Sequence, residues 1–412
     1  MKSKNRFLLK ISLLSISLVL TSASAISSAI PLMRETFSQM PLSAIEMIST
    51  VPSIMVMLFV LLCNPISQKI GSKNTVLLGL IIALICGPVP MFTSNYVVII
   101  LSRAGLGIGF GLFNSLAVSL ISDFYQGEER TRMIGYQTAF QSLGSSVIIL
   151  AVGQLIKNGW QFAFGVYMII LPILILFALF VPEPQRSTEK EISKTLPKVN
   201  YRECLPVLKY VFLMFLILSL YTAIQLKTPT LITDKKLGTV TNASVILSIL
   251  QICSMLVGFL FGAVYKKIGK YVLPLSVGCM GISFFIISVA GNLTVLCAGA
   301  VIGGVASPLF IPYLFNKVSE ISSDRMQTLS ASLLIVGAQI SAFLAPVTLN
   351  LLGKIPFGMD ETSQTFFACA ILFTMFSVGS LIMLKISLEK HKKIINNPAA
   401  IKGTTADCHN VV

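Results

Sequence analysis

The sequence predicts an all-α membrane protein with twelve transmembrane helices in two six-helix, pseudo-symmetric bundles. First, 55% of the 412 residues are hydrophobic and 11% are charged, against about 25% charged residues in a typical soluble domain. Second, the apolar residues form repeated runs long enough to cross a bilayer as helices. Third, a polar stretch near the middle of the chain separates six runs from six. Continuous apolarity excludes a membrane β-barrel, whose strands alternate apolar and polar residues.

Each of the twelve apolar runs predicts one helix. A bilayer offers no water to unpaired backbone groups, so runs of about 20 apolar residues must close their hydrogen bonds within a helix. We expect spans at roughly 11–33, 44–67, 75–94, 96–121, 133–156, 160–182, 207–226, 241–264, 271–290, 294–316, 327–352 and 364–384. The first run resembles a signal peptide, with Ala23-Ser24-Ala25 as a candidate cleavage site. We interpret it as a span because it stays uncharged to Met33 and a second span follows closely.

The distribution of basic residues predicts the orientation. With the N-terminus in the cytoplasm, most of the 31 Lys and Arg residues fall on the cytoplasmic side, as the positive-inside rule requires. The basic residues expected outside are Arg34, Lys157, Lys227, Lys235, Lys236 and Lys354. We expect a multi-pass protein of a bacterial plasma membrane with both termini cytoplasmic. The net charge of +15 is then a topology signal and does not indicate nucleic-acid binding.

The chain divides into an N-terminal bundle (1–182), a cytoplasmic linker (183–206), a C-terminal bundle (207–384) and a cytoplasmic tail (385–412). Corresponding motifs occur in the two bundles. A short basic turn follows the second span of each, and the glycines of these turns, Gly71 and Gly269, are 198 residues apart. Glu129-Arg130 and Asp324-Arg325 follow the fourth spans, 195 residues apart. The pattern indicates an internal duplication.

At these turns the sequence resembles the major facilitator superfamily, and the resemblance covers all twelve spans. It implies that the turns latch the two bundles at the cytoplasmic face. The residues to which it assigns this gating role are Lys69, Gly71, Lys73, Arg130, Gly262, Lys267, Gly269 and Arg325. The turn departs from the family pattern at two positions: Asn64 replaces a leading glycine, and Gln68 replaces an acidic residue, which weakens the charge latch. Alternatively, the basic residues of the turns only set the topology.

Arg103 is the one charge placed clearly within a span. Eight residues from the start of its helix near Asn95, it lies about 12 Å deep in a hydrocarbon core of about 30 Å. It matches the arginine of the family's fourth-helix motif, and it shares a helical stripe with Gly107, Gly111 and Asn114. Arg103 is expected to attract an anionic substrate or control a proton step; capping backbone carbonyls between helices is the alternative. Gly107 and Gly111 have the small-xxx-small spacing of close helix packing.

Polar residues at helical spacing mark further candidates for substrate binding or coupling. They are Gln137, Gln141, Tyr221, Gln225, Gln251 and Gln339. A central aqueous cavity would supply their partners, and hydrogen bonding between helices is the alternative.

Other charged residues are expected at the membrane surfaces. Lys227 is near the outer end of the seventh span, where we expect it to snorkel to the external surface. The deep parts of the spans hold no Asp or Glu; the nearest candidates for a coupling carboxylate are Glu46 and Asp123, and ordinary interfacial charges are the alternative for both. Proton coupling through a buried carboxylate is therefore not indicated. No metal-ligand cluster, nucleophile triad or phosphate loop stands out, which predicts no catalytic residue, no metal and no cofactor.

These observations and the resemblance predict a secondary active or facilitative transporter that works by alternating access. The expected substrate is a small organic solute, anionic or amphipathic, because the one deep charge is positive. A co-transported ion would be a second partner, and we expect a functional monomer in the lipid bilayer. Multidrug efflux of neutral or cationic compounds is the alternative of the same class. The alternative of another class is a transport-inactive membrane sensor or assembly partner.

Overall fold

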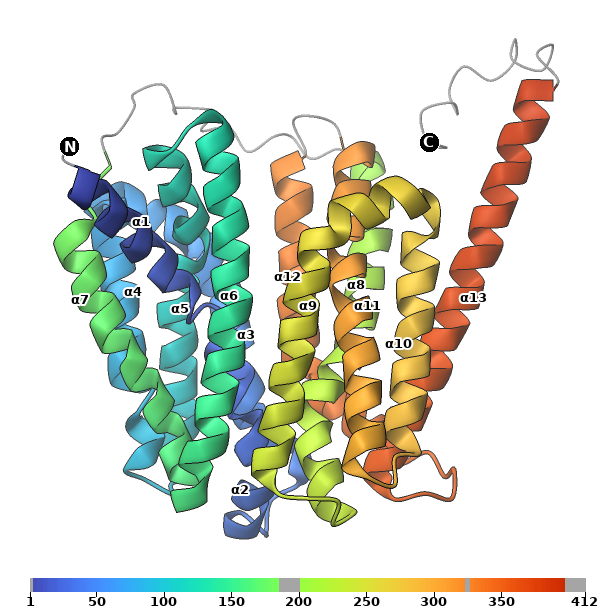
Figure 1. The fold of residues 1–412 in the computed structure, drawn as a ribbon, viewed down its shortest axis with the longest axis horizontal. Helices are drawn as coiled ribbons and strands as arrows, with labels where there is room; N and C mark the ends of the chain where they lie inside the picture. Colours follow the sequence, from blue (N-terminus) through green and yellow to red (C-terminus); the bar gives the residue numbers. More distant parts are fainter. Residues whose placement is uncertain (1–2, 185–200, 323–326, 397–412) are drawn as a thin grey trace.

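The structure is a computed structural model that describes residues 3–184, 201–322 and 327–396, and these residues are almost entirely helical. Helices α1–α7 form one group and α8–α13 a second, side by side (Figure 1). The elements of the first group are α1 (Ser3–Ser17), η1 (Ser22–Ala29), α2 (Ile30–Thr36), α3 (Leu42–Ile70), α4 (Ser72–Cys86), η2 (Val89–Met91), α5 (Tyr96–Phe124), α6 (Gly127–Leu155), η3 (Ile156–Asn158), η4 (Trp160–Ile169) and α7 (Ile170–Phe180).

The second group follows the predicted linker, most of which lies outside the described residues. Its elements are α8 (Tyr201–Asp234), α9 (Val240–Ile268), η6 (Gly269–Tyr271), α10 (Val272–Ser288), α11 (Leu293–Ile321), α12 (Gln327–Gly353) and α13 (Glu361–Asn396). Only part of the predicted tail is described, as the continuation of α13 beyond residue 384. Arg325, at the predicted repeat of the fourth-span motif, also lies outside the described residues.

The helices agree with the predicted spans. Ten stretches of the described chain are long and apolar enough to cross a membrane, and the bent first segment is an eleventh. One of the ten, Val240–Ser288, has 49 residues and contains both α9 and α10, which are separate helices in Figure 1. Counting these two separately is consistent with twelve membrane-spanning elements.

The first span differs from the continuous helix that we expected. Within it, Phe7–Ser17 and Ser22–Thr36 are bent by 47° relative to each other, and residues 22–29 form a 3₁₀ helix. Serine explains the break, because its hydroxyl competes with backbone amides for nearby carbonyls. The Ser22 hydroxyl donates to the Val19 carbonyl at 2.7 Å, and the Ser15 hydroxyl donates to the Ser12 carbonyl at 2.8 Å.

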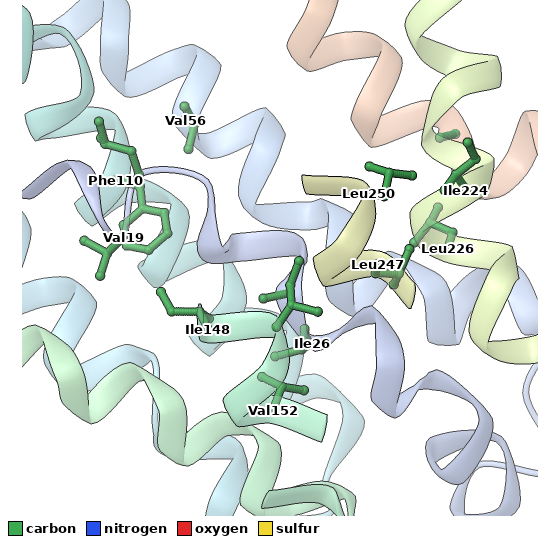
Figure 2. Close-up of a cluster of buried hydrophobic side chains, with 14 of the residues drawn as sticks. Val19, Ile26, Val56, Phe110, Ile148, Val152, Ile224, Leu226, Leu247 and Leu250 are labelled. Atoms are coloured by element: carbon green, nitrogen blue, oxygen red, sulfur yellow. The ribbon is translucent and has the colours of Figure 1, made fainter. Parts of the chain in front are cut away.

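The two groups of helices contact each other away from the ends of the chain. We call the face of the molecule that carries the α2–α3, α8–α9 and α12–α13 connections the far side. Helix α1 begins and α13 ends on the opposite face (Figure 1). The contacts run from α6 to α9 and from α3 to α12. Figure 2 shows the apolar part of this region, in which Ile26 and Val152 of the first bundle lie near Leu226 and Leu247 of the second.

Candidate functional site

A cavity of about 640 Å³ lies between the two bundles. The first bundle lines it with residues of α6, and the second bundle lines it with residues of α8, α9 and α11. Three residues proposed from the sequence, Gln141, Tyr221 and Gln251, meet there although they come from three helices. None of the described residues that line this cavity is acidic or basic. It therefore offers hydrogen bonds and apolar contacts but no countercharge.

Hydrogen bonds fix part of the cavity wall. The Gln251 Nε2 atom donates to the Ser145 hydroxyl at 2.9 Å, which joins α9 to α6 across the two bundles. Ser254, also on α9, donates to the Gly304 carbonyl at 2.9 Å and lies 3.0 Å from the Ser307 hydroxyl. Ser254 and Ser307 could not be predicted from the sequence, because single serines in apolar helices are common and give little signal.

Proline explains why the Gly304 carbonyl needs a partner from another helix. Pro308 lies inside α11 and has no N–H, so the helix provides no amide four residues after Gly304. The Ser254 hydroxyl takes the place of that amide. Pro308 and Pro312 both line the cavity, so α11 presents an interrupted backbone to any bound solute.

The remaining proposed polar residues do not line this cavity. Gln137 is buried on α6, one turn from Gln141, and Gln225 is half-buried on α8, one turn from Tyr221. Asn114 on α5 and Gln339 on α12 are also half-buried outside the lining. Helical spacing thus selected three of the four helices that line the cavity, α6, α8 and α9, but it missed α11 and also selected α5 and α12, which contribute none of the described lining residues.

Arg103 is fully buried inside the first bundle and does not line the cavity. Its Nε atom donates to the Ile48 carbonyl at 3.0 Å, and one Nη donates to the Ala23 carbonyl at 2.6 Å. Its guanidinium also lies 5.2 Å and 5.7 Å from the ring centres of Tyr167 and Phe164. This is the geometry of the alternative given above, an arginine that caps carbonyls between helices, here at the break in the first span.

Gly107 and Gly111 provide close packing next to Arg103. A Cβ atom on Gly107 would meet the Pro52 carbonyl oxygen of α3, and one on Gly111 would lie 2.6 Å from the Phe59 Cβ atom. No other residue type fits between α5 and α3 at these two points without a shift of a helix.

The expectation for Lys227 was wrong. The spans were assumed to end at residue 226, but α8 continues to Asp234 and Lys227 is 2% exposed. Its Nζ atom lies 2.8 Å from Glu46 Oε1 and donates to the Asn350 side-chain oxygen at 2.8 Å. Snorkelling fails here because α3 supplies a buried anionic partner.

Glu46 is likewise not an interfacial charge, since its side chain is completely buried. The Asn350 amide donates to its second carboxylate oxygen, Oε2, at 2.6 Å. Glu46 belongs to the first bundle, whereas Lys227 and Asn350 belong to the second. Partners this distant in sequence gave no signal, because both charges are near the ends of their apolar runs.

The two predicted gating turns differ in their surroundings. In the first, Glu183 accepts hydrogen bonds from the backbone amides of Ser72 and Lys73 at 2.7 and 3.1 Å, at the start of α4. Lys73 Nζ also donates to the Ala178 carbonyl at 2.9 Å. Gly71 has φ +91°, and Lys69 is exposed. The linker-side acid Glu183 thus acts within the first bundle.

The second gating turn has open space around its glycines. A Cβ atom on Gly262 or Gly269 would meet nothing within 4 Å, and Gly269 has φ +55°. Lys267 is exposed, as is Arg130 at the start of α6.

The sequence is similar to a transporter family profile and to several named transporters. The profile described as Major Facilitator Superfamily matches residues 12–277. Probable anion transporter 7 of Oryza sativa subsp. japonica is 28% identical over 140 residues, which are 33% of this chain and 31% of that protein. Multidrug efflux protein YfmO of Bacillus subtilis (strain 168) is 29% identical over 157 residues, 38% of this chain and 37% of that protein. These two alignments cover only about a third of each relative.

A third relative aligns over more of its length. The probable sugar efflux transporter of Mannheimia succiniciproducens is 25% identical over 302 residues, 71% of this chain and 74% of that protein.

The fold is similar to those of solved transporter structures. The D-xylose-proton symporter has a TM-score of 0.71 at 15% identity, over 90% of this chain and 97% of that one. The nucleoside transporter NupG has a TM-score of 0.72 at 12% identity, over 91% and 99%.

The family profile extends over more than half of the chain, and the helical fold agrees with those of the two solved transporters. The profile covers the first bundle and the first helices of the second, including the first gating turn and Arg103. The chain belongs to the Major Facilitator Superfamily, a family of transporters and not of enzymes.

Proposed function

We propose that this transporter moves a small, uncharged, amphipathic organic solute through the cavity between its bundles. The observation that carries the proposal is the cavity lining, which combines Gln141, Gln251 and Tyr221 with apolar residues and has no charged side chain among the described residues. A solute with a net charge would lose hydration there without gaining a countercharge. An uncharged solute with a few polar groups loses less hydration free energy, and these side chains can hydrogen-bond its polar groups.

The anionic substrate expected from Arg103 has less support. The guanidinium is fully buried, does not line the cavity, and is already bonded to the carbonyls of Ile48 and Ala23. The named relatives include anion, multidrug and sugar transporters, so their names do not select one substrate class. The choice of an uncharged substrate therefore rests on the chemistry of the cavity wall.

The wider assignments from the sequence form part of this proposal. Two bundles, bounded at residues 182 and 207, expose the cavity alternately to the two sides, and the far side is external because the basic residues lie mainly at the opposite face. The residues of the two turns act as gating residues at the cytoplasmic face. The protein functions as a monomer in a bacterial plasma membrane, with both termini in the cytoplasm.

A binding screen tests the proposed substrate class. Purified protein is heated with matched sets of uncharged, anionic and cationic amphipathic compounds, because a ligand that binds only the folded state raises its apparent stability. We expect stabilisation by uncharged compounds. The variant Gln141→Leu should weaken it, whereas Gln154→Leu, an exposed residue farther along α6, should not. Stabilisation by anions alone would refute the proposal.

A further inference from the structure

Among the described residues, two ion pairs join the bundles on the far side. Glu46 of α3 pairs with Lys227 of α8 at 2.8 Å, and Arg34 of α2 lies 3.5 Å from Asp234, also on α8. Lys227 and Asp234 are seven residues apart, so they lie on one face of α8 about two turns from each other. Each charge on α8 therefore faces an opposite charge of the first bundle. Figure 1 shows α2 and the start of α3 beside this end of α8.

The two pairs differ in their exposure to water. Glu46 and Lys227 are 0% and 2% exposed, whereas Arg34 and Asp234 are 51% and 38% exposed. Exposed pairs contribute little because water and salt screen them. A buried pair is different, since removal of one partner leaves an unpaired charge in a place without water. The pair between Glu46 and Lys227 is therefore the one that responds strongly to substitution.

Asn350 completes the buried pair. Its side-chain oxygen accepts a hydrogen bond from Lys227 Nζ, and its amide nitrogen donates to Glu46 Oε2. One amide thus bonds both charged groups at once and holds α12 against α3 and α8. This arrangement exists only while the two bundles touch, because Glu46 comes from one bundle and the other two residues come from the second.

We propose that Glu46, Lys227 and Asn350 form the far-side gate of the transporter, and that this cluster separates in each transport cycle. The proposal rests on the proposed transport function, since a cavity that opens to the far side requires α3 to move away from α8 and α12. The strength of the cluster then sets the ratio between the conformation seen here and the one open to the far side. These are positioning residues and do not contact the solute.

Removal of Lys227 should change this ratio in one direction. In Lys227→Met, the Glu46 carboxylate stays buried and unpaired while the far side is closed, and it regains water when the far side opens. The ratio should shift toward the far-side-open conformation by about 100-fold or more, given the usual cost of an unpaired buried charge. Reversal of the pair, with Glu46→Lys and Lys227→Glu in one protein, should return most of the population to the closed state.

Distances between spin labels in the purified full-length protein test the gate. One label pair replaces the exposed residues Lys157 and Lys354 on the far side, and a second replaces Gln126 and Lys270 at the opposite face. All eight natural cysteines are first replaced. In Lys227→Met we expect the far-side distance to increase and the opposite distance to decrease. The distances should return in the charge-reversed double variant.

Lys235→Met is the matched control. Lys235 is also near the end of α8, but its Nζ atom donates to the carbonyls of Ser288 and Ala290 and lies 3.9 Å from Asp360, all within the second bundle. Its removal should leave both distances as in the unsubstituted protein. A shift as large as that of Lys227→Met would overturn the proposal, because a general loss of positive charge would then explain the result.

Two further outcomes decide the question. Unchanged distances in folded Lys227→Met, or no recovery in the charge-reversed variant, would overturn the gate. If Lys227→Met does not fold, Asn350→Leu is the second variant, because it removes the amide that bonds both charged groups across the bundles, and unchanged distances in it would overturn the gate. The distances are measured without solute, so the gate and the proposed substrate class can fail independently.

Discussion

Replacement of Arg103 by alanine separates a structural role from a substrate role. The guanidinium donates to the Ile48 carbonyl of α3 and to the Ala23 carbonyl at the break in the first span. Tyr167 supports the same break, because its hydroxyl donates to the Ser22 carbonyl at 3.1 Å. In Arg103→Ala, two buried carbonyls lose their charged donors, and the break loses a contact that holds it against α5.

The size of the effect follows from these bonds. Each hydrogen bond to a charged group contributes about 1.5–3 kcal/mol, and relief from burying the guanidinium offsets part of the loss. We expect Arg103→Ala to lower the free energy of unfolding by about 2–4 kcal/mol. Arg103→Lys should lose a similar amount, since an ammonium cannot reproduce the planar fork that reaches both carbonyls.

Unfolding by sodium dodecyl sulfate in mixed micelles measures this loss, and the compound screen is repeated on each variant that remains folded. We expect the same preference for uncharged compounds in Arg103→Ala as in the unsubstituted protein. A variant of unchanged stability that no longer binds anions would refute this reasoning, because Arg103 would then act on the substrate and not on the helix break.

Three other substitutions have defined outcomes. Gly71→Val should slow transport per inserted molecule, because Gly71 has φ +91° and its Cβ would lie 2.7 Å from Glu183 Oε1; Gly127→Val, with φ +57° and open space, is the control that should transport faster than Gly71→Val. Gly153→Val should increase the far-side label distance, since its Cβ would lie 2.5 Å from the Ser244 Cβ atom of the other bundle. An unchanged distance would contradict the view that the contact between α6 and α9 closes the far side. Ser254→Ala should lower the free energy of unfolding by about 1–3 kcal/mol by leaving the Gly304 carbonyl unpaired. The loss should vanish in a Pro308→Ala background, where the helix regains its amide, and an equal loss in both backgrounds would contradict this.

Hydropathy and helical spacing predicted most of the fold. The bilayer forces long apolar runs into helices, so the described helices agree with the predicted spans except where local chemistry intervenes. Serine hydroxyls broke the first span at residues 22–29. The seventh span was predicted to end before Lys227, whereas α8 continues to Asp234. Hydropathy treats every lysine as exposed, although Lys227 has a buried anionic partner in Glu46.

The site was predicted less completely. The depth of Arg103 was evident from its position in the sequence, but its partners were not, since the Ile48 and Ala23 carbonyls carry no sequence signal. Gln141 and Gln137 share one helix face, yet only Gln141 reaches the cavity. The pairing of Glu46 with Lys227 depends on how two bundles dock, which no local pattern records.

The central claim is that an uncharged amphipathic solute crosses through the cavity between the bundles. Counterflow in proteoliposomes tests it most directly, with vesicles preloaded with an unlabelled compound from the screen and diluted into its labelled form. We predict transient, saturable uptake of the label, strongly reduced by Gln141→Leu and unaffected by Gln154→Leu. Counterflow of anions alone, or uptake that Gln141→Leu leaves unchanged, would contradict the account.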